Sequence, residues 1–560
     1  MDRRTRRTLL ALWFFLGLLP LFLRPLWEPD EARYAEIPRE MLAAGDWLTP
    51  RLNGLLYFEK PPLQYWLSAI SMKLFGVHAW AARLPLALAS GLMLWAAWRL
   101  ARRLGARDPR WASFMAATAL LGFVVGQILT LDALFSAFLV AGLAAFVEAV
   151  AARREGSPAT GWTLAAYACF AGALLTKGLA ELILTGGMFV LSLPFAWRDA
   201  PLRRALLRTA LDPAGWALYL ALSVPWFILV ERANPGHAQF FFIHEHFTRF
   251  LTHQHARQGS SNWLLDKLYF AAVLGVGLLP WLSAAVVGIK RGWAFVRRDA
   301  RALTGATGNL NRWVVAAVLA AFAWPLLFFS LSGSKLPPYI LPAVVPLAAL
   351  AASFERTGEE EGAFRRVGWE LLVLGVLLLA GAVVSRREPG LDLFWALAPG
   401  AALGALGIWV LRPVGLSGAR WMVLLGTALW ILAFGVHRSA GPSKDVSRLV
   451  RMAPPGAQWI SFGQYFQAVP FLTGERCVVV AGTGELAFGR ARLSPSEAER
   501  WLPESPEALL PTARRMAGEQ PRRPVMVLAK DRDWEAAGPE TRRPFVEVAR
   551  WGNNLLLGLP

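Results

Sequence analysis

The residues best suited to chemistry gather in one stretch near the N-terminus, residues 28–66, which we call the polar island. It carries the run Glu-Pro-Asp-Glu-Ala-Arg-Tyr at 28–34 and the run Tyr-Phe-Glu-Lys-Pro-Pro at 57–62. Strongly apolar sequence lies on both sides of it. Charges beside apolar segments are costly unless they are paired or functional. The polar island is therefore either a functional site or a solvated loop whose charges face water.

Two carboxylates and one lysine of the polar island have the clearest chemical uses. Asp30 could align or activate an acceptor group, or it could cap a helix. Lys60 precedes two prolines, which favour an extended backbone there, and it could neutralise a phosphate. Glu59 could bind a metal or pair with Arg33. The alternative for Glu59 and Lys60 is a surface ion pair that contributes less than about 1 kcal/mol.

Further polar residues stand at the ends of apolar segments. Asp132 and Lys177 could line a site, although a helix cap and a lysine reaching toward the interface explain them equally well. Lys335, in Ser-Lys-Leu-Pro-Pro-Tyr (334–339), repeats the combination of a lysine followed by two prolines. Four of the eight tyrosines occur in these motifs, where aromatic anchoring at a membrane surface would also place them: Tyr34, Tyr57, Tyr65 and Tyr339.

Histidines are concentrated in a second stretch. Five of the seven lie within residues 237–255, with His244-Glu245-His246 and Arg249 at its centre. Imidazole and carboxylate groups are typical ligands of a divalent metal. A short run of this kind also occurs in hydrated loops, so metal binding and a solvated loop both remain open at this point.

The composition indicates what kind of scaffold holds these residues. The chain has 560 residues, of which 55% are hydrophobic and 17% are charged, whereas soluble domains carry about 25% charged residues. Apolar runs near the spanning length of about 20 residues recur along it. This predicts an all-α polytopic membrane domain over residues 1–438 with roughly thirteen transmembrane helices, at about 9–27, 79–101, 112–128, 131–150, 161–176, 178–196, 213–231, 263–289, 312–333, 337–354, 367–385, 393–411 and 420–437.

The net charge of +19 reports topology rather than a nucleic-acid partner. No basic stripe is interleaved with exposed aromatics on a soluble domain. Lys and Arg instead occupy alternate connections between the spans, which predicts a cytoplasmic N-terminus. The polar island, Asp132, Lys177, the histidine-rich stretch and Lys335 then all fall on the opposite side. This common side predicts one active cavity at that membrane face.

Shorter segments complete the expected architecture. The basic N-terminus followed by an apolar run lacks a small-residue cleavage site, which predicts an uncleaved first span. Within the first outer loop, 28–78, residues 33–47 and 63–75 have the pattern of helices lying along the interface. The two cysteines, Cys169 and Cys477, fit no disulfide framework and no metal or redox motif.

From about residue 439 to 560 the composition becomes that of a soluble domain. Short β-rich runs at 459–462, 477–480 and 525–528 alternate with helical patterns at 494–501 and 507–516. This alternation predicts a small α/β domain, placed outside the cytoplasm beside the expected cavity.

Nucleotide-binding motifs are absent from the sequence, since there is no GxGxxG after a strand and no P-loop, and the zinc-protease motif HExxH is absent as well. An enzyme that works outside the cytoplasm without a nucleotide cofactor needs an activated donor already in the membrane. A sugar linked to a lipid phosphate suits a cavity rich in Lys and Arg.

Two motifs resemble a known family. Asp-Glu-Ala-Arg-Tyr-Ala-Glu at 30–36 and Tyr-Phe-Glu-Lys-Pro at 57–61 resemble the membrane glycosyltransferases of the C superfold (GT-C), in particular the aminoarabinose lipid A transferase branch, which is related to protein O-mannosyltransferases. Residues 334–342 and 464–471 resemble further family patterns. The resemblance covers nearly the whole chain and specifies the family better than it specifies the sugar.

The resemblance implies an activity and roles for individual residues. A monosaccharide, 4-amino-4-deoxy-L-arabinose, would pass from undecaprenyl phosphate to lipid A at the periplasmic face of the bacterial inner membrane, and the enzyme would be a monomer. Asp30 and Asp132 would be catalytic, Glu59 with His244 or His246 would bind a zinc-like divalent metal, and the following would bind substrate and carrier phosphate: Lys60, Arg249, Arg33, Tyr34, Tyr57, Lys335 and Tyr339.

Two other functions remain to be compared with this one. The same fold and donor class could serve a protein Ser/Thr or other glycan acceptor. A transporter of lipid or sugar would instead place ionisable residues near the bilayer midplane on broken helices, whereas this sequence gathers its unusual charges at one face.

Overall fold

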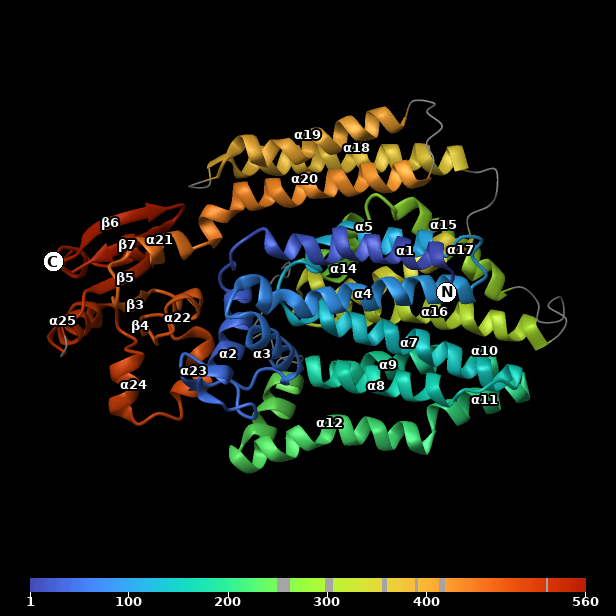
Figure 1. The fold of residues 1–560 in the computed structure, drawn as a ribbon, viewed down its shortest axis with the longest axis horizontal. Coiled ribbons are helices and arrows are strands. Elements are labelled where there is room, and N and C mark those ends of the chain that lie inside the picture. Colours follow the sequence, from blue (N-terminus) through green and yellow to red (C-terminus); the bar gives the residue numbers. More distant parts are fainter. Residues whose placement is uncertain are drawn as a thin grey trace.

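The computed structural model describes residues 1–248, 262–297, 306–354, 360–387, 391–411, 418–519 and 522–559. Long helices lie side by side along one direction, and the C-terminal segment, residues 445–559, covers one end of this bundle (Figure 1). Helices α18 to α20 run along one edge of the bundle and α12 along the opposite edge. The polar island lies between the bundle and the C-terminal segment.

The bundle and its connections contain the following helices: α1 Arg3–Leu12, η1 Trp13–Leu18, η2 Leu19–Phe22, α4 Ala79–Arg103, α5 Arg110–Thr118, α6 Leu120–Val125, α7 Leu131–Glu155, α8 Thr160–Lys177, α9 Ala180–Ser192, α10 Pro194–Trp197, α11 Ala200–Ala210, α12 Pro213–Ala233, η3 Gln239–Thr248, α14 Trp263–Gly277, α15 Leu282–Arg297, α16 Ala306–Leu331, η5 Pro337–Ala343, α17 Val344–Phe354, α18 Glu360–Val384, η6 Ser385–Arg387, α19 Leu393–Val410 and α20 Gly418–Lys444.

Apolar length makes this a multi-pass membrane protein. In the described residues, seven helical stretches are long and apolar enough to cross a membrane, and an eighth is obtained if the bent pair α14 and α15 counts as one span. That pair is bent by 114°. The expected span at 112–128 is likewise divided, because α5 ends and α6 begins on either side of Ala119, whose backbone is extended. Composition predicts apolar length and cannot show where a helix breaks.

The polar island folds into two helices and a hairpin. Helix α2 spans Asp30–Ala44, and α3 spans Leu63–Phe75 as predicted. Because α2 begins three residues earlier than expected, Pro38 lies in its interior. Between the helices, β1 (Arg51–Leu52) and β2 (Leu55–Leu56) pair antiparallel. Asn53 and Gly54 both have positive φ, as the tight turn of a two-residue hairpin requires.

The C-terminal segment contains a five-stranded sheet in the order β4-β3-β5-β7-β6. Strands β3, β4 and β5 are parallel, and β7 and β6 join antiparallel. All three predicted strands are present, whereas β6 and β7 were not predicted. The elements of the segment are α21 Ser447–Met452, β3 Gln458–Phe462, α22 Ala468–Thr473, β4 Val478–Val480, η7 Gly484–Leu486, α23 Ala487–Arg490, α24 Pro495–Trp501, η8 Pro506–Ala508, α25 Leu509–Gly518, β5 Val525–Lys530, α26 Asp531–Ala536, α27 Pro539–Arg542, β6 Val546–Trp551 and β7 Asn554–Gly558.

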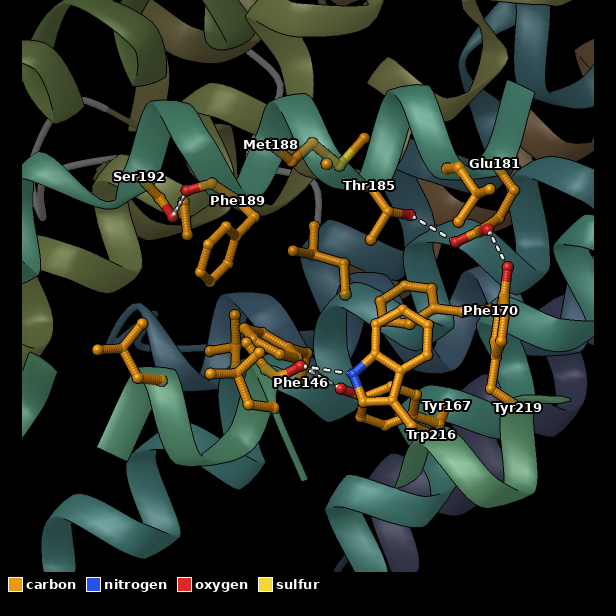
Figure 2. A pocket seen from close by; sticks show the side chains of 18 of the residues that line it. Phe146, Tyr167, Phe170, Glu181, Thr185, Met188, Phe189, Ser192, Trp216 and Tyr219 are labelled. Atoms are coloured by element: carbon orange, nitrogen blue, oxygen red, sulfur yellow. Dashed lines mark hydrogen bonds between the residues drawn. The ribbon is translucent and has the colours of Figure 1, made fainter. Parts of the chain in front are cut away.

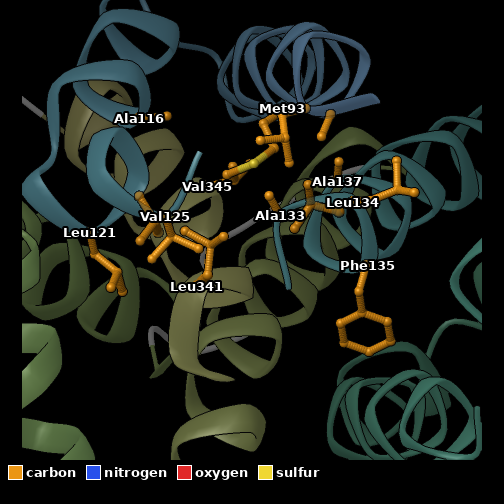
Figure 3. Packing of buried hydrophobic residues seen from close by; sticks show 14 of the residues in the cluster. Met93, Ala116, Leu121, Val125, Ala133, Leu134, Phe135, Ala137, Leu341 and Val345 are labelled. Atoms are coloured by element: carbon orange, nitrogen blue, oxygen red, sulfur yellow. The ribbon is translucent and has the colours of Figure 1, made fainter. Parts of the chain in front are cut away.

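Small apolar residues let the central helices approach closely. Ala133 and Ala137 of α7, Met93 of α4, and Leu341 and Val345 near the start of α17 pack in one cluster (Figure 3). All are buried. Since lipid offers no hydrophobic force between helices, close packing of this kind holds the bundle together.

One buried carboxylate connects the polar island to the bundle. Glu31 of α2 is 1% exposed and pairs with Arg24, after the first span, and with the fully buried Arg83 of α4. Arg83 donates two hydrogen bonds to it, at 3.0 and 2.9 Å. The backbone N–H groups of Trp27 and Leu129 also donate to it. Burial alone would raise the pKa of Glu31, but the two arginines hold it well below its usual range.

The first prediction concerns this ion cluster. Glu31→Gln leaves Arg24 and Arg83 buried without a counter-charge, so we expect the free energy of unfolding to fall by about 3–5 kcal/mol. Glu155→Gln is the control, because Glu155 is 47% exposed in its pair with Arg103 and should lose less than about 1 kcal/mol. Denaturant titration of detergent-solubilised protein measures both. Equal losses in the two variants would contradict the prediction.

Candidate active site

Asp30 stands at the rim of a buried charged group. Its carboxylate is 52% exposed and pairs with Arg33, whose side chain is only 4% exposed. Arg33 also pairs with Glu485 of the C-terminal segment. Asp30 does not cap α2, because it is the first residue of the helix. Its carboxylate is thus open to a ligand while a buried guanidinium holds it in place.

Three buried tyrosines lie beside Arg33. The rings of Tyr34 and Tyr65 stack with centroids 6.0 Å apart. The hydroxyls of Tyr57 and Tyr65 have no hydrogen-bond partner in the described part of the chain. Burial raises the pKa of all three tyrosines, so they stay protonated. Because buried hydroxyls are nearly always hydrogen-bonded, these two are free to donate to a ligand.

Asp132 and Lys177 form a second charged pair. Asp132 lies in the first turn of α7, Lys177 is the last residue of α8, and Lys177 donates to Asp132 at 2.5 Å. The Lys177 ammonium lies 4.1 Å from the ring centre of Tyr339. Lys177 is therefore held by a carboxylate and an aromatic face. Asp132 makes no cap, since Thr130 is the residue at the helix start.

Tyr34 lies beside the Asp30–Arg33 pair, with the Arg33 guanidinium 5.1 Å from the centre of its ring. Besides burial, charges that act on its hydroxyl include Arg33, Asp30, Glu59 and Asp132. These groups come from α2, from the loop before α3 and from the start of α7, all at the end of the bundle that faces the C-terminal segment (Figure 1). These residues of the predicted site thus lie at one end of the bundle, and their sharing of a single cavity stays a prediction.

Lys60 takes part in a smaller contact with η3. Its ammonium pairs with Glu245 at 3.2 Å and donates to the backbone oxygen of Glu59 at 2.8 Å. Glu59 is not the partner of Arg33, which binds Asp30 and Glu485 instead. Arg249 and the side chains of His244 and His246 lie outside the described residues.

Lys335 is placed differently from the other predicted ligands of phosphate. Its fully buried ammonium donates to the backbone oxygens of Ser330 and Ser332, at 3.1 and 2.5 Å, and lies 3.4 Å from Asp266. These contacts join α14 to the end of α16. In the described chain its polar contacts are therefore not with the Asp30 or Asp132 pairs.

A metal site cannot be assembled from the described residues. They contain no group of three or more His, Cys, Asp or Glu placed to hold an ion. Glu59 is half-buried and supplies one carboxylate, and the histidines predicted to join it are the ones whose side chains are not described. We therefore derive no chemical step through a metal.

The C-terminal segment is attached to the polar island by buried hydrogen bonds. The side chain of Asn53 donates to the backbone oxygen of Cys477 at 2.8 Å and accepts from its N–H at 3.0 Å. Glu28 accepts from the backbone N–H groups of Gln467 and Ala468. Burial raises the pKa of Glu28 to about 8 although both N–H groups favour its ionised form.

Similarity to known proteins identifies the family of this chain. Residues 59–229 match the family described as dolichyl-phosphate-mannose-protein mannosyltransferase. An undecaprenyl phosphate-α-4-amino-4-deoxy-L-arabinose arabinosyl transferase from Edwardsiella ictaluri is 33% identical over 80% of each chain. The chain belongs to this transferase family. A relative from Sodalis glossinidius with the same activity in its name is 34% identical over 74% of this chain and 69% of its own.

Solved structures support the assignment. The transferase matches ArnT from Cupriavidus metallidurans with a TM-score of 0.76 and 26% identity, over all of this chain and 97% of that one. The same enzyme has been solved with undecaprenyl phosphate bound. The resemblance that the motifs at 30–36 and 57–61 indicated is confirmed, and the protein is a membrane glycosyltransferase.

Some site residues of the transferase could not be found from sequence. Glu485 follows Gly-Thr-Gly in a segment without a recognisable catalytic pattern, yet it binds Arg33. Gln467 in turn donates to Glu485 at 3.0 Å. A contact between residues more than four hundred positions apart leaves no local signal in one sequence.

One member of the histidine-rich stretch belongs to the core. His237 is fully buried, and its ring lies 4.9 Å from that of Phe58, 5.2 Å from that of Trp226 and 5.7 Å from that of Phe241. Burial lowers the pKa of His237 to about 4, although the charge of Glu231 opposes the shift. The imidazole is therefore neutral in the folded transferase at neutral pH.

The second prediction follows from His237. The unfolded state takes up its proton near pH 6.5 and the folded state only near 4, so stability is full above pH 6.5 and falls as the pH drops toward 4, by about 3 kcal/mol. His237→Phe should remove this part of the slope when thermal unfolding is followed across that range. His78→Gln, at an exposed histidine, should keep it. A variant at 237 with an unchanged slope would refute the assignment.

Proposed function

We propose that this transferase moves 4-amino-4-deoxy-L-arabinose from undecaprenyl phosphate to a phosphate of lipid A at the periplasmic face of the inner membrane. The observation that carries the proposal is that the Asp30–Arg33 and Asp132–Lys177 pairs each lie beside a tyrosine, Tyr34 and Tyr339 respectively, in a chain whose relatives carry this activity in their names. Cations and hydroxyls at the end of a membrane bundle suit a lipid phosphate.

The proposed reaction is a displacement at the anomeric carbon of the sugar. An oxygen of the acceptor phosphate forms the new bond to that carbon, and the electron pair of the breaking bond goes to the phosphate oxygen of the carrier. Lys60 and Arg249 stabilise the charge that develops on the leaving phosphate. Asp30 aligns the acceptor at the rim, because its carboxylate is exposed and fixed by Arg33.

The remaining residues are assigned to binding. Tyr34, Tyr57 and Tyr339 line the donor site, and the unpaired hydroxyl of Tyr57 supplies a hydrogen bond. Asp132 orients Lys177 beside Tyr339. Lys335 contributes positive charge to the same end of the bundle.

The topology and domain division belong to the same proposal. Besides the seven long apolar stretches, the described chain has the bent pair α14–α15, the divided segment α5–α6 and three shorter apolar helices. If these also cross the membrane, the structure is compatible with the thirteen predicted spans. Residues 1–438 would form the membrane domain, with 28–78 as its first periplasmic loop, and 439–560 a periplasmic α/β domain. Basic connections at the other end of the bundle support a cytoplasmic location for that end. We propose that the transferase works as a monomer.

A hydroxyl acceptor on a protein Ser or Thr is the second candidate. The match of residues 59–229 to the mannosyltransferase family favours it. A hydroxyl must lose its proton as it attacks, so Asp30 would then act as a general base, whereas a phosphate acceptor is already ionised. The two candidates therefore differ in how transfer depends on pH below neutrality.

The third prediction tests the function. Lipid A from cells that express the transferase should carry the amino sugar by mass spectrometry, and Asp30→Asn should reduce transfer by about 100-fold or more while binding of undecaprenyl phosphate is retained. Glu504→Gln is the matched control, because Glu504 is an exposed carboxylate paired with Arg490 in the C-terminal segment. Modified protein with unmodified lipid A would favour the second candidate, and full activity of Asp30→Asn would exclude its catalytic role.

The fourth prediction concerns a metal. We propose a zinc-like divalent ion bound by Glu59 and either His244 or His246, since carboxylate and imidazole are suitable ligands. Purified transferase should contain about one equivalent of metal by elemental analysis, and Glu59→Gln should lose it. Glu475→Gln, at another partly exposed carboxylate, should keep it. Stoichiometric metal in Glu59→Gln would show that Glu59 is not a ligand.

A further inference from the structure

A cavity of about 340 Å³ lies inside the bundle, away from the candidate active site. Helices α7, α8, α9, α11, α12 and α16 surround it, and Figure 2 shows its side chains converging from α9 on one side and from α7, α8 and α12 on the other. Most are large and apolar: Phe146, Phe170, Met188, Phe189 and Trp216. Its size and lining are those of a ligand site.

Most polar groups of the cavity already have partners. The hydroxyls of Tyr219 and Thr185 donate to Glu181 at 2.8 and 2.9 Å. Tyr167 and Trp216 both donate to the backbone oxygen of Ala210. Among the described residues that line the cavity, Trp313 is the exception, because its indole N–H is buried without a partner. A polar occupant could pair with this one donor only, and its remaining polar groups would lose their hydrogen bonds. The chemistry of the walls selects a hydrocarbon chain.

The Glu181–Tyr219 bond lies at the end of the cavity nearest the candidate active site. Glu181 is only four residues after Lys177 along the chain and is 1% exposed. A polyprenyl tail entering from that side would have to displace this buried pair. An occupant that enters from the other end meets no such barrier.

The other end of the cavity is formed by α11, which carries arginines. Leu207, Ala210 and Leu211 line the cavity, and Arg204 and Arg208 are exposed on the same helix, one turn apart. Arg208 precedes Leu211 by three residues, so the two share a face. In the described chain neither arginine forms an ion pair with a carboxylate. Leu211 is 68% exposed and Trp216 39%.

We propose that this cavity binds one acyl chain of an anionic glycerophospholipid whose phosphate contacts Arg204 and Arg208. Helix α11 lies at the end of the bundle opposite the C-terminal segment (Figure 1), where basic residues predominate. Basic pockets between helices at this membrane surface attract anionic headgroups, with about 1 kcal/mol for each nearby Lys or Arg. Exposed Trp216 lies where an aromatic ring favours the interface. The lipid is a resident of the membrane and is not a substrate.

The experiment is native mass spectrometry of the full chain titrated with phosphatidylglycerol, phosphatidylcholine or undecaprenyl phosphate. Gly186→Phe fills the cavity, because Gly186 lines it and a Cβ added there meets no atom within 4 Å. Gly275→Phe is its control, since Gly275 of α14 has equal space and lies outside the cavity. We expect Gly186→Phe to weaken phosphatidylglycerol binding about tenfold and Gly275→Phe to leave it unchanged.

Substitution of the two arginines provides an independent test of the proposal. Arg204→Ala with Arg208→Ala should weaken phosphatidylglycerol binding about tenfold or more and leave phosphatidylcholine binding unchanged, while Arg107→Ala, at an exposed arginine elsewhere, should change neither. Unaltered phosphatidylglycerol binding in the double variant overturns the proposal even if Gly186→Phe fails to fold. Loss of undecaprenyl phosphate instead of phosphatidylglycerol in Gly186→Phe overturns it as well, because the cavity would then hold the carrier tail.

Discussion

The carboxylate of Glu31 is the constraint on which the site depends. One side chain gathers Arg24, Arg83 and two backbone N–H groups from three separate stretches of chain. A buried ion cluster of this kind adds little net stability compared with apolar packing, but it tolerates only one arrangement because any other leaves charges unpaired. Asp30 and Arg33 are next to it on the same helix. The bundle thereby determines where the exposed carboxylate of Asp30 stands.

Sequence patterns predicted which end of the bundle carries the candidate site, but not which side chains pair with one another there. Local patterns sufficed for α3, for the three parallel strands and for the charged motifs, because each is encoded within about ten residues. Strand β7, with its three consecutive leucines, fits helix and strand equally and was missed. Asp30 and Glu31 are adjacent, and only the fold distinguishes the exposed one from the buried one. The partnership of Arg33 with Glu485 depends on tertiary contact.

Charged side chains are arranged differently at the two ends of the bundle. At the end covered by the C-terminal segment, the cations Arg33 and Lys177 are largely buried, each is paired with a carboxylate, and each lies beside a tyrosine ring. At the opposite end, exposed arginines of α11 face the membrane surface, and the hydrogen-bonded Glu181 and Tyr219 lie between these two regions. Under our two proposals, lipid phosphates are recognised at both surfaces by different means, through buried ion pairs at one and through exposed arginines at the other.

The reciprocal hydrogen bonds between Asn53 and Cys477 have a consequence for biosynthesis. The turn that carries Asn53 leaves the ribosome early, whereas its partner strand is among the last parts to be made. The same holds for Arg33 and Glu485. Until the C-terminal segment has been made, the first loop lacks the surface against which it is ordered. A chain that ends before Cys477 therefore lacks the partners of both Asn53 and Arg33.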